Sequence, residues 1–158
     1  MIKYIKGDAT EPIQKPAMIC HMCNDIGKWG KGFVLALSNK WPVTREKYIA
    51  WHKGLITNYS LDLPLGELQS VKVEDDIWVY NMIAQEGIYT KDGKPPIRYE
   101  ALAKCLITIH VIACMKKRSI HMPRIGCGLA GGEWDKVKNL INLTLSEHDV
   151  YVYDLPKG

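Results

Sequence analysis

Two glycine-rich segments contain the residue types best suited to holding a ligand. Residues 24–32 read Asn-Asp-Ile-Gly-Lys-Trp-Gly-Lys-Gly, and residues 126–132 read Gly-Cys-Gly-Leu-Ala-Gly-Gly. Glycine lets backbone N–H groups approach a ligand closely. Each segment leads into a predicted helix, whose first N–H groups are unpaired and attract anions. Two such loops at one sheet edge would hold a diphosphate from both sides, which indicates a nucleotide-like ligand. The alternative is that these glycines only form tight turns.

Two common nucleotide-binding classes do not fit these loops. Gly126, Gly128 and Gly131 match the G-x-G-x-x-G pattern of Rossmann domains. Only 27 residues follow Gly131, too few for the rest of a Rossmann half. The sequence also contains no G-x-x-x-x-G-K-[ST] motif, which excludes a P-loop NTPase.

Three polar side chains near the predicted strand ends are candidates for chemistry. Asp25 opens the first glycine segment and is a candidate general base, or forms a local Asx turn. His21 ends the preceding strand and points either into the site or into the core, where it would be hydrogen-bonded. Asp8 follows the first predicted strand and either accepts a hydrogen bond from an adenine amino group or caps a turn.

The cysteines and remaining histidines show no metal-binding pattern. Cys20 and Cys23 form a C-x-x-C pair, but no second pair has ligand spacing, so they are interpreted as small core residues. His110 and His148 have no partner pattern and are interpreted as structural or exposed. We therefore expect no metal and no cofactor. Five cysteines without framework spacing favour reduced thiols and a cytoplasmic location.

Apolar periodicity predicts alternating strands and helices. The predicted helices cover residues 33–40, 44–53, 98–117 and a segment starting after Glu133, with Thr44 as an N-cap. Residues 87–96 are interpreted as a mobile loop. The predicted strands are residues 2–6, 17–22, 69–73, 77–84, 119–122 and 150–155. This order predicts an α/β sandwich around a largely parallel sheet.

Length and charge limit the remaining function classes. A chain of 158 residues suits a single domain over residues 1–158. Its longest apolar stretch, residues 106–115, is too short for a membrane span. Net charge is +4, with +5 in residues 1–60, −4 in residues 61–100 and +3 in residues 101–158. This modest bias does not predict a nucleic-acid-binding protein, but the excess positive charge accompanies the two glycine segments.

Three blocks of the sequence resemble a macrodomain over residues 4–155. They are Lys6-Gly7-Asp8-Ala9-Thr10, then Cys23-Asn24-x-x-Gly27-x-Trp29-Gly30-x-Gly32, then the run from Met122 to Trp134. The similarity is to the branch containing the ADP-ribose-1''-phosphate phosphatases and the terminal ADP-ribose protein glycohydrolase. It implies a three-layer α/β/α sandwich with a mixed, largely parallel central sheet that binds ADP-ribose.

The resemblance also implies ligand-binding roles by position. Asp8 would contact the adenine amino group with the Ala9 backbone beside it, and Tyr153 would lie near the adenine. Asn24 would lie near the distal ribose. One side of the diphosphate would be covered by Gly30, Lys31 and Gly32, and the other by Ile125, Gly126, Cys127, Gly128, Leu129 and Ala130.

For catalysis, the resemblance implies hydrolysis of ADP-ribose-1''-phosphate or removal of ADP-ribose from a conjugate. The lysine and aspartate of the glycohydrolase correspond here to Gln85 and Ala130, which does not favour a lysine-dependent mechanism. A phosphatase-like reaction would use a water activated by Asp25 or His21. The alternative function is a non-catalytic reader of free ADP-ribose or of an ADP-ribosylated protein.

Overall fold

The computed structural model describes residues 1–57 and 62–156 of the chain. In chain order, its elements within these ranges are β1 (Ile2–Lys6), β2 (Ala17–Asn24), α1 (Phe33–Lys40), α2 (Val43–Thr57), β3 (Leu68–Glu74), β4 (Ile77–Gln85), α3 (Tyr99–Lys116), β5 (Ser119–Pro123), α4 (Trp134–Thr144) and β6 (Val150–Asp154). Every predicted strand and helix is present. Among the described residues, no helix has the length and apolar character needed to cross a bilayer.

The strands form one mixed, largely parallel sheet in the order β1-β6-β5-β2-β4-β3. Four of the five neighbouring pairs are parallel, and only β3 with β4 is antiparallel. The turn at Asp75-Asp76 explains the exception, because a short hairpin connection forces the two strands to run in opposite directions. The predicted sheet is confirmed.

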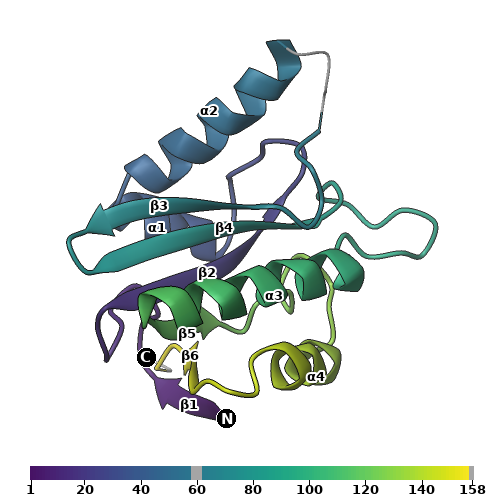
Figure 1. The fold of residues 1–158 in the computed structure, drawn as a ribbon. Coiled ribbons are helices and arrows are strands. Elements are labelled where there is room, and N and C mark those ends of the chain that lie inside the picture. The colour runs from purple at the N-terminus through teal and green to yellow at the C-terminus, as the bar shows by residue number, and fades with distance from the viewer. Residues whose placement is uncertain (58–61, 157–158) are drawn as a thin grey trace.

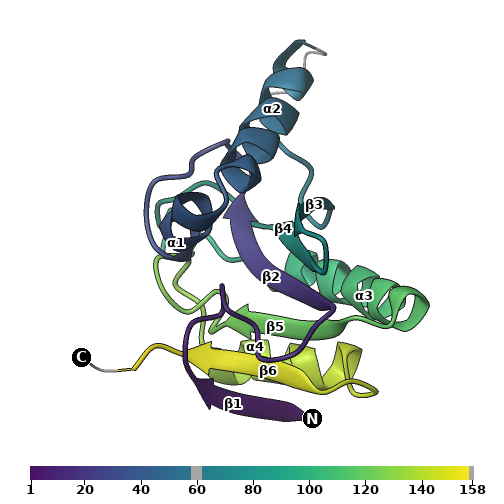
Figure 2. The same cartoon turned by 90° about the vertical axis from the view of Figure 1, so that its left-hand side faces the viewer.

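Helices cover both faces of this sheet and produce the three layers visible in Figures 1 and 2. Side chains alternate along β2: Met18 and Cys20 pack into a core beneath α3 and α4, while Ile19 and Cys23 pack beneath α1 and α2. This alternation follows from the two-residue repeat of a strand. The α/β/α sandwich is therefore built from two cores that share one buried sheet.

Two helix boundaries differ from the sequence prediction in instructive ways. The prediction of Thr44 as an N-cap is wrong, because α2 begins one residue earlier. The buried Thr44 hydroxyl instead donates to the Trp41 carbonyl oxygen over 2.8 Å. Helix α3 ends at Lys116, since Lys117 adopts the left-handed conformation that often terminates helices.

Candidate functional site

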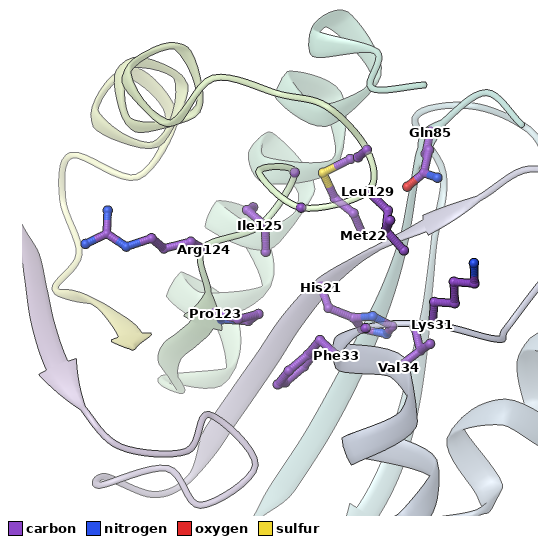
Figure 3. A pocket seen from close by; sticks show the side chains of 14 residues that line it. His21, Met22, Lys31, Phe33, Val34, Gln85, Pro123, Arg124, Ile125 and Leu129 are labelled. Carbon is purple, nitrogen blue, oxygen red and sulfur yellow. The ribbon is translucent and has the colours of Figure 1, made fainter. Parts of the chain in front are cut away.

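The two glycine segments meet because the strands that precede them are neighbours. β2 and β5 pair in parallel, so the loops that follow their carboxyl ends emerge at the same sheet edge. We call residues 25–32 the first loop and residues 124–133 the second loop. They flank a pocket of about 260 Å³ (Figure 3). Its lining residues are His21, Met22, Lys31, Gly32, Phe33, Val34, Gln85, Pro123, Arg124, Ile125, Gly126, Gly128, Leu129 and Ala130.

The second loop presents a run of free backbone donors. Among the described residues, the N–H groups of residues 126–130 have no acceptor within the protein. The next two N–H groups hold the loop in shape: Gly131 donates to the Gly128 oxygen over 3.0 Å and Gly132 to the Gly126 oxygen over 2.6 Å. Unpaired N–H groups in a compact turn form a concave site that attracts anions. The second loop can therefore bind a phosphate through backbone alone.

The glycines of the second loop differ in whether the fold requires glycine at their positions. A Cβ at Gly132 would lie 2.5 Å from the Gly126 carbonyl oxygen, and one at Gly126, where φ is 77°, would lie 2.7 Å from Ile97. These two glycines are required by packing and backbone conformation. A Cβ at Gly128 would meet no atom within 4 Å, although Gly128 lines the pocket. The fold alone therefore gives no reason for glycine at position 128.

The first loop places a helix terminus on the opposite side of the pocket. Helix α1 starts at Phe33, and its N-cap Gly32 provides no side-chain hydrogen bond to the first turn. Gly32, Phe33 and Val34 all line the pocket. The positive end of the helix dipole and its uncapped N–H groups thus lie at the ligand site. Lys31 adds an exposed ammonium group at the rim.

Asn24 shapes the first loop from within. Its Oδ1 accepts hydrogen bonds from the N–H groups of Ile26 (3.1 Å) and Lys28 (3.0 Å) and from the Tyr48 hydroxyl (2.8 Å). Its Nδ2 donates to the Lys28 carbonyl oxygen over 2.7 Å. Asn24 does not line the pocket. Its observed contacts are those of a residue that fixes the loop, and its predicted place near a distal ribose stays a prediction.

His21 lines the pocket and is at the same time buried. Its ring lies beside Phe33 and Val34 in Figure 3. Nε2 is hydrogen-bonded to Asn81 Oδ1, and Asn81 Nδ2 donates to Gln69, so the proton is assigned to Nε2. Nδ1 is buried and has no partner among the described residues. Burial lowers the pKa of His21 to about 4, so the imidazole is neutral at pH 7 and Nδ1 is a buried, unpaired acceptor.

Asp25 does not line the pocket, although His21 does. Its carboxylate accepts the Gly87 N–H over 2.8 Å, its backbone N–H donates to Gln85, and its carbonyl oxygen accepts the Leu63 N–H. Burial, as the largest cause, raises the pKa of Asp25. These contacts tie the first loop to two other loops. Of the two candidate bases, His21 therefore lies on the pocket wall, whereas Asp25 does not.

The three residues predicted near an adenine lie together beside the pocket. Asp8 Oδ1 accepts hydrogen bonds from both the N–H and the hydroxyl of Thr10, each over 2.8 Å, as the turn-capping interpretation predicts. Ala9 and Tyr153 are buried in one small cluster against which Phe33 packs. Since Phe33 also lines the pocket, this cluster adjoins the ligand site. The Tyr153 hydroxyl accepts a hydrogen bond from the Ile13 N–H and is also hydrogen-bonded to His121 Nδ1.

Some residues that line the pocket were not predicted from the sequence. The side chain of one of them stabilises the fold instead of reaching into the pocket. Met22, Phe33, Val34, Pro123 and Arg124 line the pocket. The Arg124 side chain points away from the pocket centre in Figure 3 and donates two hydrogen bonds to the Asp154 carboxylate, of 2.7 and 3.0 Å. The available signal for the others was their position at the carboxyl end of β2 or β5, or at the start of α1.

Gln85 and Ala130, which the family resemblance pairs with the glycohydrolase lysine and aspartate, both line the pocket. Gln85 is anchored through Nε2 to the Gly87 carbonyl oxygen over 3.1 Å, and Ala130 is nearly buried. Neither side chain can carry charge. Cys127, by contrast, does not line the pocket, and its thiol donates to Ile125 within the second loop.

The C-x-x-C pair is confirmed as two core residues. Cys20 packs into the core beneath α3 and α4, and Cys23 into the core beneath α1 and α2. Burial raises the pKa of both thiols. They lie on opposite faces of the sheet and cannot act as a pair.

Solved structures of other proteins share the whole fold of this chain. No protein-family model matches the sequence. A protein of unknown function from Bacteroides thetaiotaomicron is 49% identical over 98% of both chains, with a TM-score of 0.90. A macrodomain protein from Streptomyces coelicolor is 44% identical over 98% of this chain and 99% of its own, with a TM-score of 0.82. A macrodomain from Oceanobacillus iheyensis, solved with ADPR, shares the fold at 19% identity, with a TM-score of 0.72 over 98% of this chain and 84% of its own.

Three curated proteins are also similar in sequence. An uncharacterized 17.5 kDa protein of phage T4 is 27% identical over 98% of this chain and 96% of its own. The ADP-ribose 1''-phosphate phosphatase of Candida albicans is 27% identical over 96% of this chain and 99% of its own. A chromodomain-helicase-DNA-binding protein 1-like from Danio rerio is 31% identical over 95% of this chain, but the chain spans only 15% of that protein.

Proposed function

Because this chain belongs to the macrodomain family, we propose that it binds ADP-ribose in the pocket between the two loops and hydrolyses ADP-ribose-1''-phosphate or a related ADP-ribose conjugate. The fold neighbour from Oceanobacillus iheyensis was solved with ADPR, and a relative similar over almost the whole chain is named a phosphatase for ADP-ribose 1''-phosphate. We further propose that residues 1–158 are one macrodomain. Five free cysteines favour a reducing, cytoplasmic location.

The observation that carries the binding proposal is the run of free N–H groups at residues 126–130 facing an uncapped helix terminus. A diphosphate between them accepts hydrogen bonds from one side and interacts with the helix dipole on the other. Backbone donors need no cluster of cationic side chains, which agrees with the small net charge of +4. Lys31 supplies a positive charge at the rim.

This position of the diphosphate orients the rest of the ligand. In the proposed pose the adenosine extends toward Asp8, Ala9 and Tyr153, beyond Phe33. Both hydrogen bonds from Thr10 go to Asp8 Oδ1, so the other carboxylate oxygen is available to accept one from the adenine amino group. The distal ribose then lies on the side of the pocket formed by Gln85 and Ala130.

For hydrolysis, we propose that His21 activates water. Its Nε2 proton is held by Asn81, so Nδ1, once a local movement of the pocket wall exposes this buried atom, is the acceptor that takes a proton as water attacks the terminal phosphorus. The bond between phosphorus and the ribose oxygen breaks, and that oxygen takes up a proton from the His21 imidazolium or from solvent, which releases inorganic phosphate and ADP-ribose. Free N–H groups of the second loop stabilise the added negative charge. Asp25 is the second candidate base, although its present contacts hold it among neighbouring loops.

One observation favours the reader function as an alternative. None of the described pocket-lining residues is Asp or Glu, and the two positions that correspond to glycohydrolase catalytic residues are Gln85 and Ala130. With a pKa of about 4, His21 is also a weak base at neutral pH. A pocket of this kind would retain ADP-ribose, free or attached to a protein, without turnover.

Two measurements separate these outcomes. Calorimetry with ADP-ribose should show binding, and phosphate release should follow addition of ADP-ribose-1''-phosphate. His21→Gln keeps a nitrogen donor for Asn81 but removes Nδ1, so it should retain binding and lose at least tenfold in turnover. Asp25→Asn is the matched comparison for the other candidate base. Binding without phosphate release by the unchanged protein would favour the reader, and no binding at high ligand concentration would refute both functions.

A further inference from the structure

Two histidines and a cysteine from two separate segments of the chain converge at the end of the sheet opposite the pocket. His110 and Cys114 lie one turn apart on α3, and His148 lies in the segment between α4 and β6. His110 Nδ1 is 2.8 Å from His148 Nε2, and Cys114 Sγ is 3.8 Å from the former and 3.7 Å from the latter. Three nitrogen and sulfur atoms therefore surround one point, and we propose that this His110–Cys114–His148 cluster is a zinc-binding site.

The distances fit tetrahedral zinc without rearrangement of the backbone. Zn–N and Zn–S bonds of about 2.0–2.1 and 2.3 Å separate two nitrogens by about 3.3 Å, and a nitrogen from a sulfur by about 3.6 Å. The observed separations of 2.8, 3.7 and 3.8 Å differ from these by roughly half an ångström or less. Small side-chain rotations cover that difference. Both histidines are half-buried and Cys114 is exposed, so an ion can enter.

The donor chemistry selects the type of metal. Two imidazole nitrogens and one thiolate suit a borderline-soft ion such as Zn²⁺, whereas Mg²⁺ and Ca²⁺ prefer oxygen ligands. No fourth His, Cys, Asp or Glu in the described part of the chain joins the cluster. Water or an external ligand would complete the tetrahedron.

The position of the cluster gives the ion a structural task distinct from the ADP-ribose pocket. Helix α3 begins near the pocket, where Arg98 N–H donates to the Ala84 oxygen, and runs back to the opposite edge, where β5 starts at Ser119. His148 is also tied to the first strand, because its carbonyl oxygen accepts the Met1 ammonium group over 2.6 Å. Bound zinc would therefore link α3 to the segment that holds β1 and β6.

The test uses Zn²⁺ and Co²⁺ alone with the full-length protein under reducing conditions. We expect one equivalent of Zn²⁺ per chain by calorimetry and a rise in melting temperature when Zn²⁺ is added. Co²⁺ should produce a thiolate-to-metal charge-transfer absorption that Zn²⁺ abolishes by displacement.

Variants assign the signal to these three residues. Cys114→Ser, at an exposed position, should remove the charge-transfer absorption and weaken Zn²⁺ binding at least tenfold. His148→Gln should weaken it similarly. Cys127→Ser is the matched thiol control and should keep the full metal signal. A wild-type protein without the charge-transfer absorption, or a Cys114→Ser protein that retains it, would overturn the proposal. ADP-ribose binding is measured separately, so failure of either site leaves the other result intact.

Discussion

The Gly128→Val variant tests whether the second loop contacts the diphosphate. A Cβ at Gly128 has no atom within 4 Å and points into free space beside the pocket. The backbone there is outside the left-handed region, so valine does not meet the strain that a side chain has at positive φ. We therefore expect the free energy of unfolding to change by no more than about 0.5 kcal/mol.

The expected loss of binding is much larger. Valine places three carbon atoms where a phosphate must approach the run of free N–H groups. Loss of one or more hydrogen bonds to a charged phosphate costs about 1.5–3 kcal/mol, which corresponds to a roughly 10- to 150-fold rise in Kd. Gly128→Ala should show a smaller rise, because a single methyl group leaves more of the pocket open.

Calorimetry with ADP-ribose and urea unfolding of the same samples separate these effects. Gly54→Val is the matched control, since a Cβ at this exposed position in α2 also meets no atom within 4 Å. It should bind ADP-ribose with unchanged affinity. Gly126→Val is the opposite case and should lose stability, because its Cβ would lie 2.7 Å from Ile97 at a φ of 77°. A folded Gly128→Val protein that binds ADP-ribose normally would show that the second loop is not at the ligand.

Three further results are expected. Asp8→Asn keeps an oxygen for Thr10 but weakens the proposed adenine contact, so calorimetry should show a loss of about 1–3 kcal/mol in binding with little change in stability; unchanged affinity would contradict the adenine assignment. Tyr153→Phe removes two hydrogen bonds of the hydroxyl and should lower the free energy of unfolding by about 1–3 kcal/mol in urea titrations, whereas a neutral result would mean that solvent replaces them. Burial lowers the pKa of His21 and His121 from 6.5 to about 4, so the unfolded state binds more protons between those values. Stability should be constant with respect to these groups above about pH 7 and fall as the pH drops toward 4, by up to about 1.4 kcal/mol per pH unit for each histidine; a flat urea midpoint from pH 7 to 5 would refute this.

The fold could be predicted because its apolar patterns are local and regular. In α3, Leu102, Cys105, Leu106 and Ile109 recur at helical spacing, and all four are buried in the core beneath the helix. The placement of both glycine segments after parallel strands then predicts a shared sheet edge. Local pattern was sufficient for these features, since neither depends on which distant side chains meet.

The roles of individual residues within the site depend on which side chains lie close together in the fold. The sequence does not give those distances. His21 and Asp25 lie four residues apart, yet one lines the pocket and the other is held by Gly87 in a different loop. The bend of the chain just after β2 decides between them. Gly126 and Gly128 are likewise indistinguishable by residue type, and only their neighbours reveal that the first is required by the fold.

The pocket lies where the three layers of the sandwich meet. His21 and Phe33 belong to the side covered by α1, whereas Ile125 and Ala130 pack with the core under α3 and α4. The two helical layers are otherwise joined through the sheet between them. A molecule bound in the pocket would contact both layers and so form a second connection between them. Such a molecule would therefore add contacts that join the two helical layers directly.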